Sequence, residues 1–352
     1  MNYEVEQEIV AFFEKTTTTR SACDNYASEH LGGNITPVNV QGVCSYTIYA
    51  GPNAESVVQY RLKSLALNME IMDLVNAIYG TLTPQVSFKG QIGEDHESKE
   101  PLYIYVMNRM AGVSHLDFIL AHNSDVLENS SEFSCWRQNL VADNAKYILS
   151  YRFFALSWKG PQDIDQTYRE SLTHQYERDL NSLLTSLPIR FDPLIKKSLN
   201  SLPAIFSLPM VLPHNDFSSF NMLVDENSCN LLDVIGWAES EIAPFGINIY
   251  AHDRLISKIH LKHGWSKYDD YRLLDELFWS TFRQETGVDD ETIQVIKAAR
   301  IAGVFLWLGF TSRLSNESKP IPISDGDESG EFRMRDLYGL LINPATRFTD
   351  LV

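Results

Sequence analysis

The chain has 352 residues, of which 44% are hydrophobic and 21% charged, which is enough to bury a large core and to divide into about two domains or lobes. Its formal net charge of −17 at pH 7 argues against nucleic acid or an anionic membrane as a partner and is compatible with a small-molecule substrate. No apolar run reaches membrane-spanning length.

The first 15 residues are predicted to form a leading amphipathic helix. Val5, Ile9, Phe12 and Phe13 fall on one helical face, and the segment is acidic. It therefore resembles neither a signal peptide nor a transit peptide. Because the cysteines form no C-x-x-C pair, we expect reduced thiols in a cytoplasmic protein; they are Cys23, Cys44, Cys135 and Cys229.

Residues 1–110 are expected to form a small N-terminal lobe of the nucleotide-binding type. Strands are predicted over 45–49, 56–61 and 102–107, and Gly51, Pro52 and Asn53 form the turn between the first two. A helix is predicted between the second and third strands from the spacing of Leu65, Met69, Met72 and Tyr79. Residues 108–112 would be a hinge.

Residues 111–352 are expected to form a larger, mainly helical lobe. Helices are predicted near 271–284 and 290–309, and an exposed loop over 318–330. Two further helical faces are predicted, one from Val141, Ala145, Ile148 and Leu149, the other from Tyr168, Leu172, Tyr176, Leu180 and Leu183. A strand-rich lobe followed by a helical lobe gives an α+β fold.

A catalytic motif stands in the second lobe. His214, Asp216 and Asn221 have the spacing H-x-D-x-x-x-x-N, which is typical of a kinase catalytic loop. In such a loop the Asp accepts the proton of the attacking hydroxyl, and the Asn holds a magnesium ion. Three fixed residues recur by chance in roughly a few per cent of chains of this length, so the motif needs support from its surroundings.

The residues after the motif supply that support. Asn221–Val224 and Leu231–Ile235 are short apolar runs separated by a polar turn, which predicts a β-hairpin. The hairpin is followed by Val-Ile-Gly-Trp-Ala-Glu-Ser-Glu over 234–241 and by Pro-Phe-Gly over 244–246. Kinase-like enzymes place their second metal ligand at this end of the hairpin.

These motifs resemble the fungal branch of the aminoglycoside phosphotransferase and choline kinase family, whose run is typically V-I-D-W-A-E-A-E followed by P-F-G. The resemblance extends over nearly the whole chain, through QGVCSYTIYAG, VVQYRL, FFALSWKGPQ, GFTSRLSNE and LLINPATRF. It implies a two-lobed protein-kinase-like fold. It also places Gly236 where the family has its metal-binding aspartate.

Neither nearby carboxylate is expected to replace that aspartate. Asp233 lies three residues before Gly236 on a strand, so the two positions face opposite sides unless a bulge intervenes. Glu239 would reach a cation only along a changed loop path. Because Mg²⁺ needs a near-octahedral oxygen shell, Asn221 alone should hold it weakly. An Asp-to-Gly change is also what a cloning variant or a deliberate inactivation would give.

The resemblance implies nucleotide contacts in the first lobe. Arg61 stands where a basic side chain contacts the phosphates, with Glu70 as its expected helix partner and Asp73 as rival. The structural alternative is an arginine at a strand end whose aliphatic stem packs on the protein while its guanidinium is solvated. Residues 41–47 offer the hydroxyls of Ser45 and Thr47 as a weak phosphate cradle.

The remaining candidate residues are expected to support the catalytic loop or to line the acceptor pocket. In this family His214 supports the catalytic loop through a hydrogen bond, which is also the structural expectation for a buried histidine. His252 and Asp253 could line the acceptor pocket or cap a helix. Glu239, Trp237 and Phe245 are expected around the same pocket, where aromatic rings could wall an apolar ligand site or belong to the core.

Three functions follow as hypotheses. The leading one is an enzyme of fungal secondary metabolism that has lost Mg-ATP chemistry, needs no cofactor, and cyclises an apolar small molecule or transfers its protons through Asp216. The second is an ATP- and Mg-dependent hydroxyl kinase with Asp216 as base. The third is a non-catalytic pseudokinase that binds a ligand.

Overall fold

The computed structural model describes residues 3–122, 130–145, 153–260, 263–311, 314, 316, 319–326 and 330–351. The chain divides into two compact units. The N-terminal unit contains Met1–Ala77, Thr83–Met110 and Leu314–Ser318, and the C-terminal unit contains Ile78–Leu82, Ala111–Arg313 and Lys319–Val352. Each unit is described by itself.

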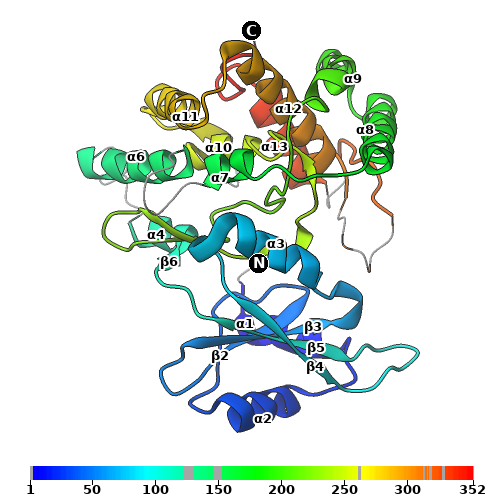
Figure 1. Cartoon of the computed structure of the whole chain (residues 1–352), viewed down its shortest axis with the longest axis vertical. Coiled ribbons are helices and arrows are strands. Elements are labelled where there is room, and N and C mark those ends of the chain that lie inside the picture. The colour runs from blue at the N-terminus through cyan, green and yellow to red at the C-terminus, as the bar shows by residue number, and fades with distance from the viewer. Residues whose placement is uncertain are drawn as a thin grey trace. The chain divides into compact units, whose positions relative to one another are not determined.

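The N-terminal unit is built on a five-stranded antiparallel sheet in the order β1-β2-β3-β5-β4 (Figure 1). The predicted strands are present, and the sheet gains an edge strand on each side. The strands are β1 (Thr36–Pro37), β2 (Ser45–Ala50), β3 (Ser56–Leu62), β4 (Val86–Ile92) and β5 (Leu102–Asn108). Gly51 has a φ of 93°, which lets the chain reverse tightly between β2 and β3.

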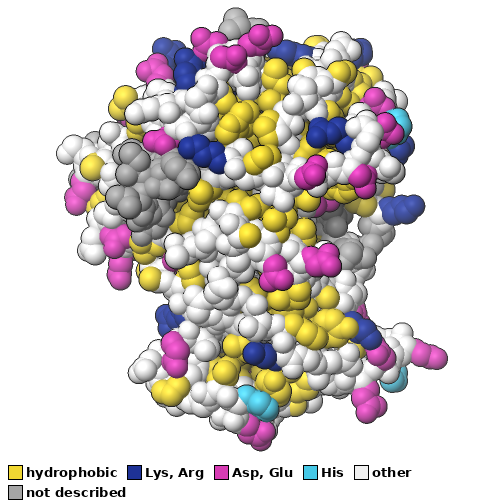
Figure 2. Space-filling view, in the orientation of Figure 1, with side chains coloured by type: hydrophobic (Ala, Val, Ile, Leu, Met, Phe, Trp, Pro, Cys, Tyr) yellow, Lys and Arg dark blue, Asp and Glu magenta, His cyan; other side chains and the backbone are white. Residues whose placement is uncertain are grey.

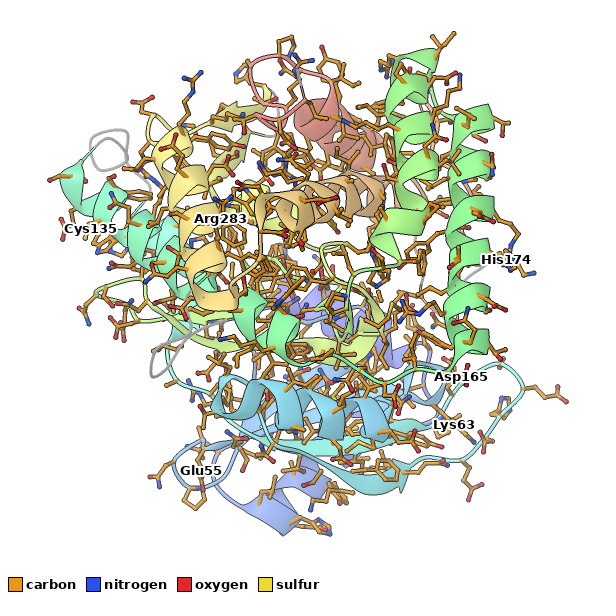
Figure 3. The ribbon with its side chains drawn as sticks, turned by 45° about the horizontal axis from the view of Figure 1, so that its top comes forward. Glu55, Lys63, Cys135, Asp165, His174 and Arg283 are labelled. Atoms are coloured by element: carbon orange, nitrogen blue, oxygen red, sulfur yellow. The ribbon has the colours of Figure 1, made fainter. Side chains whose placement is uncertain are left out.

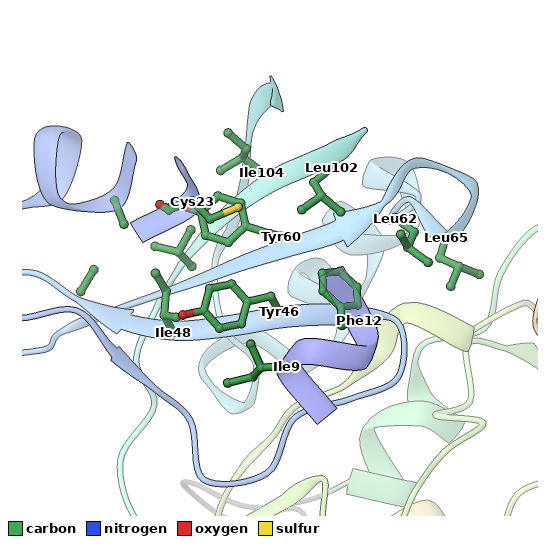
Figure 4. Close-up of a cluster of buried hydrophobic side chains, with 13 residues drawn as sticks. Ile9, Phe12, Cys23, Tyr46, Ile48, Tyr60, Leu62, Leu65, Leu102 and Ile104 are labelled. Atoms are coloured by element: carbon green, nitrogen blue, oxygen red, sulfur yellow. Dashed lines mark hydrogen bonds between the residues drawn. The ribbon is translucent and has the colours of Figure 1, made fainter. Parts of the chain in front are cut away.

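Two helices cover one face of this sheet. α1 (Val5–Phe13) is the predicted leading helix and buries Ile9 and Phe12 against Tyr46 and Ile48 (Figure 4). α2 (Arg20–Leu31) was not predicted, because its sequence has little amphipathic periodicity. Its N-terminus is capped by the Thr19 side chain, which accepts a hydrogen bond from the Ala22 amide. The alternating strand residues therefore give the sheet one apolar face, under α1 and α2.

The helix predicted after β3 is α3 (Met69–Tyr79), preceded and followed by the short 3₁₀ turns η1 (Lys63–Leu65) and η2 (Gly80–Leu82). The predicted spacing is correct, although Leu65 lies in η1. Met72, Val75 and Tyr79 are buried.

The described part of the C-terminal unit is mainly helical, as predicted, with three small antiparallel sheets. The strands are β6 (Val113–Ser114), β8 (Met222–Val224) and β9 (Leu231–Val234) in one sheet, β7 (Met210–Val211) with β10 (Ala243–Pro244), and β11 (Ser257–His260) with β12 (Gly264–Lys267). The helices are α4 (His115–Ala121), α6 (Ser131–Ala145), α7 (Phe153–Lys159), α8 (Gln166–Ser186), α9 (Asp192–Ile205), α10 (Tyr250–Leu255), α11 (Tyr271–Thr286), α12 (Asp290–Leu308) and α13 (Glu331–Leu341), with 3₁₀ turns η3 (Ile189–Phe191) and η4 (Trp237–Glu239). The predicted hairpin is β8–β9, with a register irregularity between Leu223 and Val224.

Apolar helix faces form the core of this unit. α12 packs against α8, α9 and α13 (Figure 1), and most of its side chains are buried. The predicted face of α8 is buried except at Tyr168, whose hydroxyl instead donates to the Ile242 carbonyl at 2.8 Å. Asp165 caps the start of α8 (Figure 3). On α6, Val141 and Ala145 are buried as predicted, while Ile148 and Leu149 lie outside the described residues.

The surface and the thiols agree with the composition. On the face shown in Figure 2, Asp and Glu side chains are spread among basic and apolar ones. None of the four cysteines is in a disulfide: Cys23 and Cys229 are buried, Cys44 is half-buried, and Cys135 is exposed on α6 (Figure 3). Within the described part of the chain, no helix combines the length and apolar character needed to cross a bilayer.

Candidate functional site

The segment between β7 and β8 carries the motif, and His214 fixes it to the end of the β8–β9 hairpin. The His214 ring is buried, and its Nε2 donates to the Ile235 carbonyl at 2.7 Å. The ring also packs edge-on against Trp237 at 4.6 Å. Burial lowers the pKa of His214, so the ring is neutral and carries its proton on Nε2. This geometry is that of a loop support.

Asp216 and Asn221 lie together at the exposed end of the loop. The Asn221 Nδ2 donates at 2.8 Å both to the Asp216 carboxylate and to the Asp216 carbonyl. The Asn221 carbonyl accepts from the Ile235 amide at 2.9 Å, which ties the loop to β9. The Asp216 side chain is exposed. The motif therefore presents one accessible carboxylate whose position is set by an amide donor.

Gly236 is fitted to its position by conformation and by space. It has φ 83° and ψ 37°, in the left-handed region that L-residues seldom adopt. A Cβ at this position would lie 2.6 Å from the Asn221 Oδ1 and 2.8 Å from its Cγ. The Asn221 side chain thus lies where a side chain at 236 would begin.

The residues around Asp216 do not fit the magnesium site of a kinase. Asp233 is only 6% exposed, accepts a hydrogen bond from the Ala111 backbone, and has its pKa raised to about 6 by burial. Glu239 is exposed, and its carbonyl accepts from the Asn215 Nδ2. Within the described residues, no three His, Cys, Asp or Glu side chains are grouped as metal ligands. Asn221 is left as the one ligand that the motif provides.

Four of the side chains expected around the acceptor pocket are buried, namely Trp237, Phe245, His252 and Asp253. Trp237 donates through Nε1 to the Val234 carbonyl at 2.9 Å, and Phe245 stacks on Phe282 at 5.4 Å. The physical reason is that neighbouring helices cover these rings. Glu239 keeps an exposed position.

His252 and Asp253 lie inside α10 and cap no helix. The His252 ring is fully buried and stacks on Phe278 at 4.0 Å, and burial lowers its pKa to about 3. Asp253 pairs with Arg300 at 3.0 Å and accepts from the Tyr271 hydroxyl at 2.8 Å. Both side chains therefore have a structural role.

One polar side chain that the sequence did not indicate supports the loop of the motif. The Asn248 Nδ2 donates to the His214 carbonyl at 3.3 Å and so holds the segment before α10 against this loop. No local pattern marks Asn248, because only tertiary packing brings it to the loop.

In the N-terminal unit, the predicted nucleotide-contacting residues share the sheet face opposite α1 and α2. Ser45 pairs with Arg61 and Thr47 with Gln59 across β2 and β3. The Ser45 and Thr47 hydroxyls lie 3.3 Å apart. Arg61 donates to the Leu65 carbonyl at 2.8 Å and to the Gln59 side chain at 3.2 Å. These four residues form a polar strip, while Glu70 is exposed in the first turn of α3.

Comparison with known proteins gives a likeness in fold. No model of a known protein family and no curated protein matches the chain. A protein from Ralstonia eutropha with a provisional aminoglycoside phosphotransferase assignment is 13% identical, with a TM-score of 0.52 over 90% of this chain and 95% of its own. An ethanolamine kinase from Plasmodium vivax is 14% identical, with a TM-score of 0.44 over 88% of each chain. The first likeness, with the strand-rich and helical units, establishes the protein-kinase-like fold.

Proposed function

We propose that this chain is an enzyme that uses a phosphotransferase-like fold for proton transfer on an apolar small molecule, leading to cyclisation or isomerisation, without Mg-ATP. The observation that carries the proposal is the exposed Asp216 in an ordered catalytic loop whose neighbouring position, Gly236, has no carboxylate. The assignment to fungal secondary metabolism rests on the sequence resemblance around residues 234–246.

Asp216 can do this chemistry alone. An exposed carboxylate accepts a proton from a bound molecule and returns it elsewhere, and such assistance is typically worth about a hundred- to ten-thousand-fold in rate. The Asn221 amide holds the carboxylate in place through its 2.8 Å hydrogen bond. No step needs a metal ligand at position 236.

A mass-spectrometric screen tests the proposal. Purified protein would be incubated with candidate metabolites, with and without Mg-ATP, and the products compared with those of Asp216→Asn. We expect an isomeric product without Mg-ATP, and turnover lower by about a hundredfold or more in Asp216→Asn with ligand binding retained. Retained turnover in Asp216→Asn would remove this residue from the mechanism.

A second candidate is an ATP- and Mg-dependent hydroxyl kinase with Asp216 as base. The polar strip of Ser45, Thr47, Gln59 and Arg61 favours it, because these are donors of the kind that contact phosphates. A product heavier by one phosphoryl group, formed only with Mg-ATP, would establish this candidate. Binding without any product would instead favour a pseudokinase.

A further inference from the structure

The N-terminal unit contains an open groove that is separate from the residues of the proposed reaction. Its volume is about 530 Å³, within the range of pockets that hold small organic ligands. It is lined by the four consecutive threonines 16–19, by Arg20, His96 and Lys99, and by the Phe13 ring. The chain has 46 Asp and Glu residues against 29 Lys and Arg, yet no carboxylate is among the described residues that line this groove. Its lining therefore favours an anion.

Backbone hydrogen bonds join the two walls of the groove. One wall is the segment between α1 and α2, and the other is the connection between β4 and β5. The Thr17 amide donates to the Glu100 carbonyl at 2.8 Å, and the Glu100 amide donates to the Lys15 carbonyl at 3.0 Å. The Thr17 hydroxyl lies 3.3 Å from the same Glu100 carbonyl. Because Lys99 directly precedes Glu100, these bonds set the place of Lys99 against the threonine segment.

Three side chains of the groove offer hydrogen-bond donors. The Ser98 amide donates to the His96 Nδ1 at 3.4 Å, so the neutral ring carries its proton on Nε2. The Lys99 ammonium and the Thr18 hydroxyl bond to no other side chain or backbone group in the described part of the chain. Both walls therefore contribute donors that a ligand in the groove can use.

The positive charge of the groove comes mainly from Lys99. The Arg20 guanidinium is 2.6 Å from the Glu6 carboxylate and 3.6 Å from that of Asp24, so its charge is compensated. Lys99 has no such partner among the described residues, and its side chain is exposed. A bound anion would pair with this ammonium.

The Phe13 ring gives the groove an apolar part. It is half-buried and packs edge-on against Tyr46, with 5.1 Å between the ring centres. Its remaining surface lines the groove. An anion that carries an apolar body would cover this surface and remove it from water.

We propose that this groove binds a small organic phosphate monoester, with the phosphate at Lys99, His96 and Thr18 and the apolar body on Phe13. A phosphate group has several oxygens that accept charge-assisted hydrogen bonds, which matches a lysine, an imidazole and a hydroxyl. The site goes beyond the proposed function. It uses none of the residues assigned to proton transfer, so it stands or falls independently of Asp216.

Calorimetric titration of the full chain with phenyl phosphate tests this site. We expect binding that weakens as NaCl is added. The Kd should rise by about two- to fivefold in Lys99→Met and in His96→Ala, which is the size expected for an exposed charge contact. Both side chains are exposed, so the Tm of each variant should equal that of wild type.

Lys89→Met is the matched control. Lys89 is also an exposed lysine of the N-terminal unit, on β4, and it does not line the groove. Its loss should leave the Kd unchanged. Equal weakening in Lys89→Met and Lys99→Met would show attraction by general surface charge and overturn the proposal. An unchanged Kd in Lys99→Met, or no binding by wild type at millimolar phenyl phosphate, would also overturn it.

Two further titrations separate the remaining alternatives. Inorganic phosphate should bind more weakly than phenyl phosphate, because it makes no contact with Phe13; equal or tighter binding would overturn the organic monoester as the ligand. Asp216→Asn should bind phenyl phosphate as wild type does. A loss of binding in Asp216→Asn would place the ligand at the catalytic loop and overturn the groove as its site.

Discussion

At the scale of single residues, the proposed chemistry depends on Gly236. The left-handed backbone and the Asn221 side chain together make glycine the residue that fits without strain. Asp and Asn tolerate this backbone region better than other side chains do. Aspartate and asparagine are therefore the substitutions with the smallest backbone cost.

The variant Gly236→Asp tests directly whether a carboxylate at position 236 changes the affinity for Mg-ATP. Without ligand, its stability should fall by about 1–2 kcal/mol, because the new Cβ strains the backbone and displaces Asn221. Its affinity for Mg-ATP, measured by calorimetry, should rise above that of wild type. Gly236→Ala is the control, because it adds the same Cβ against the Asn221 side chain and no carboxylate. If the Asp variant binds no better than the Ala variant, the nucleotide contacts at Arg61 or Ser45 are the next to test.

Two aspartates of the β8–β9 hairpin should give opposite pH dependences. Burial raises the pKa of Asp233 to about 6, so the folded protein holds this proton up to a higher pH than the unfolded chain does. Its ionisation therefore destabilises the fold as pH rises from about 4 through 6. Asp233→Asn should be more stable than wild type at pH 7, by on the order of 1–3 kcal/mol, with no gain at pH 4.

Asp225, in the hairpin turn, is the matched comparison. Hydrogen bonds from Ser228 and from the Ser228 and Asn227 amides lower its pKa, so its stabilisation is present above about pH 4 and is lost as pH falls. Asp225→Asn should be less stable than wild type at pH 7, with the difference shrinking in acid. Urea unfolding at several pH values measures the free energy of unfolding of both variants. If the stability difference from wild type changed with pH in the same way for the two variants, the opposite pKa shifts of Asp233 and Asp225 would be wrong.

At the scale of elements, α12 is held by a buried ion network. Arg300 is 1% exposed and pairs with Asp253 from α10 and Asp350 from the segment after α13. Its guanidinium also lies 3.9 Å from the centre of the Phe348 ring. The helix can carry an arginine among apolar residues because two carboxylates and an aromatic face compensate its charge.

Removing the Arg300 side chain should lower the free energy of unfolding, because its carboxylate partners are then left without a cation. Arg300→Met is expected to lose about 3–5 kcal/mol, because Asp253 remains buried without its cation. The double variant Arg300→Met with Asp253→Asn should be more stable than that single variant, since it removes the unpaired carboxylate. Arg283→Met, which breaks only the exposed pair with Asp290 (Figure 3 labels Arg283), should lose less than about 1 kcal/mol. Equal losses in the two single variants, measured by urea unfolding, would contradict the network.

At the scale of the whole molecule, the fold is protein-kinase-like, while position 236 carries no carboxylate. The sheet of the N-terminal unit retains a polar strip, and the C-terminal unit retains the catalytic loop. The missing carboxylate at 236 should therefore weaken binding of the nucleotide through its magnesium ion.

Thermal unfolding with Mg-ATP measures this. A competent kinase with nucleotide at about a hundred times its Kd would gain roughly 2.7 kcal/mol. We expect a much smaller gain here, and little difference between ATP with and without Mg²⁺. Tight, magnesium-dependent binding in calorimetry would show that another ligand completes the metal site.

The sequence by itself determined the features that depend on neighbouring residues. The helix α3, the β8–β9 hairpin and the buried face of α8 follow from short-range periodicity, and the H-x-D-x-x-x-x-N spacing located Asp216 and Asn221. The position of Gly236 came from the same reading. The helix α2 was not predicted, because its sequence has no clear periodicity.

Only the tertiary structure decided which of these side chains a ligand can reach. It buried Trp237, Phe245, His252 and Asp253, and it brought Asn248 to the His214 carbonyl. Burial is set by contacts between segments far apart in the chain, as when Asp253 and Asp350 both pair with Arg300. No local pattern encodes such contacts. The sequence could therefore indicate which residues carry the proposed chemistry, but not which residues line the site.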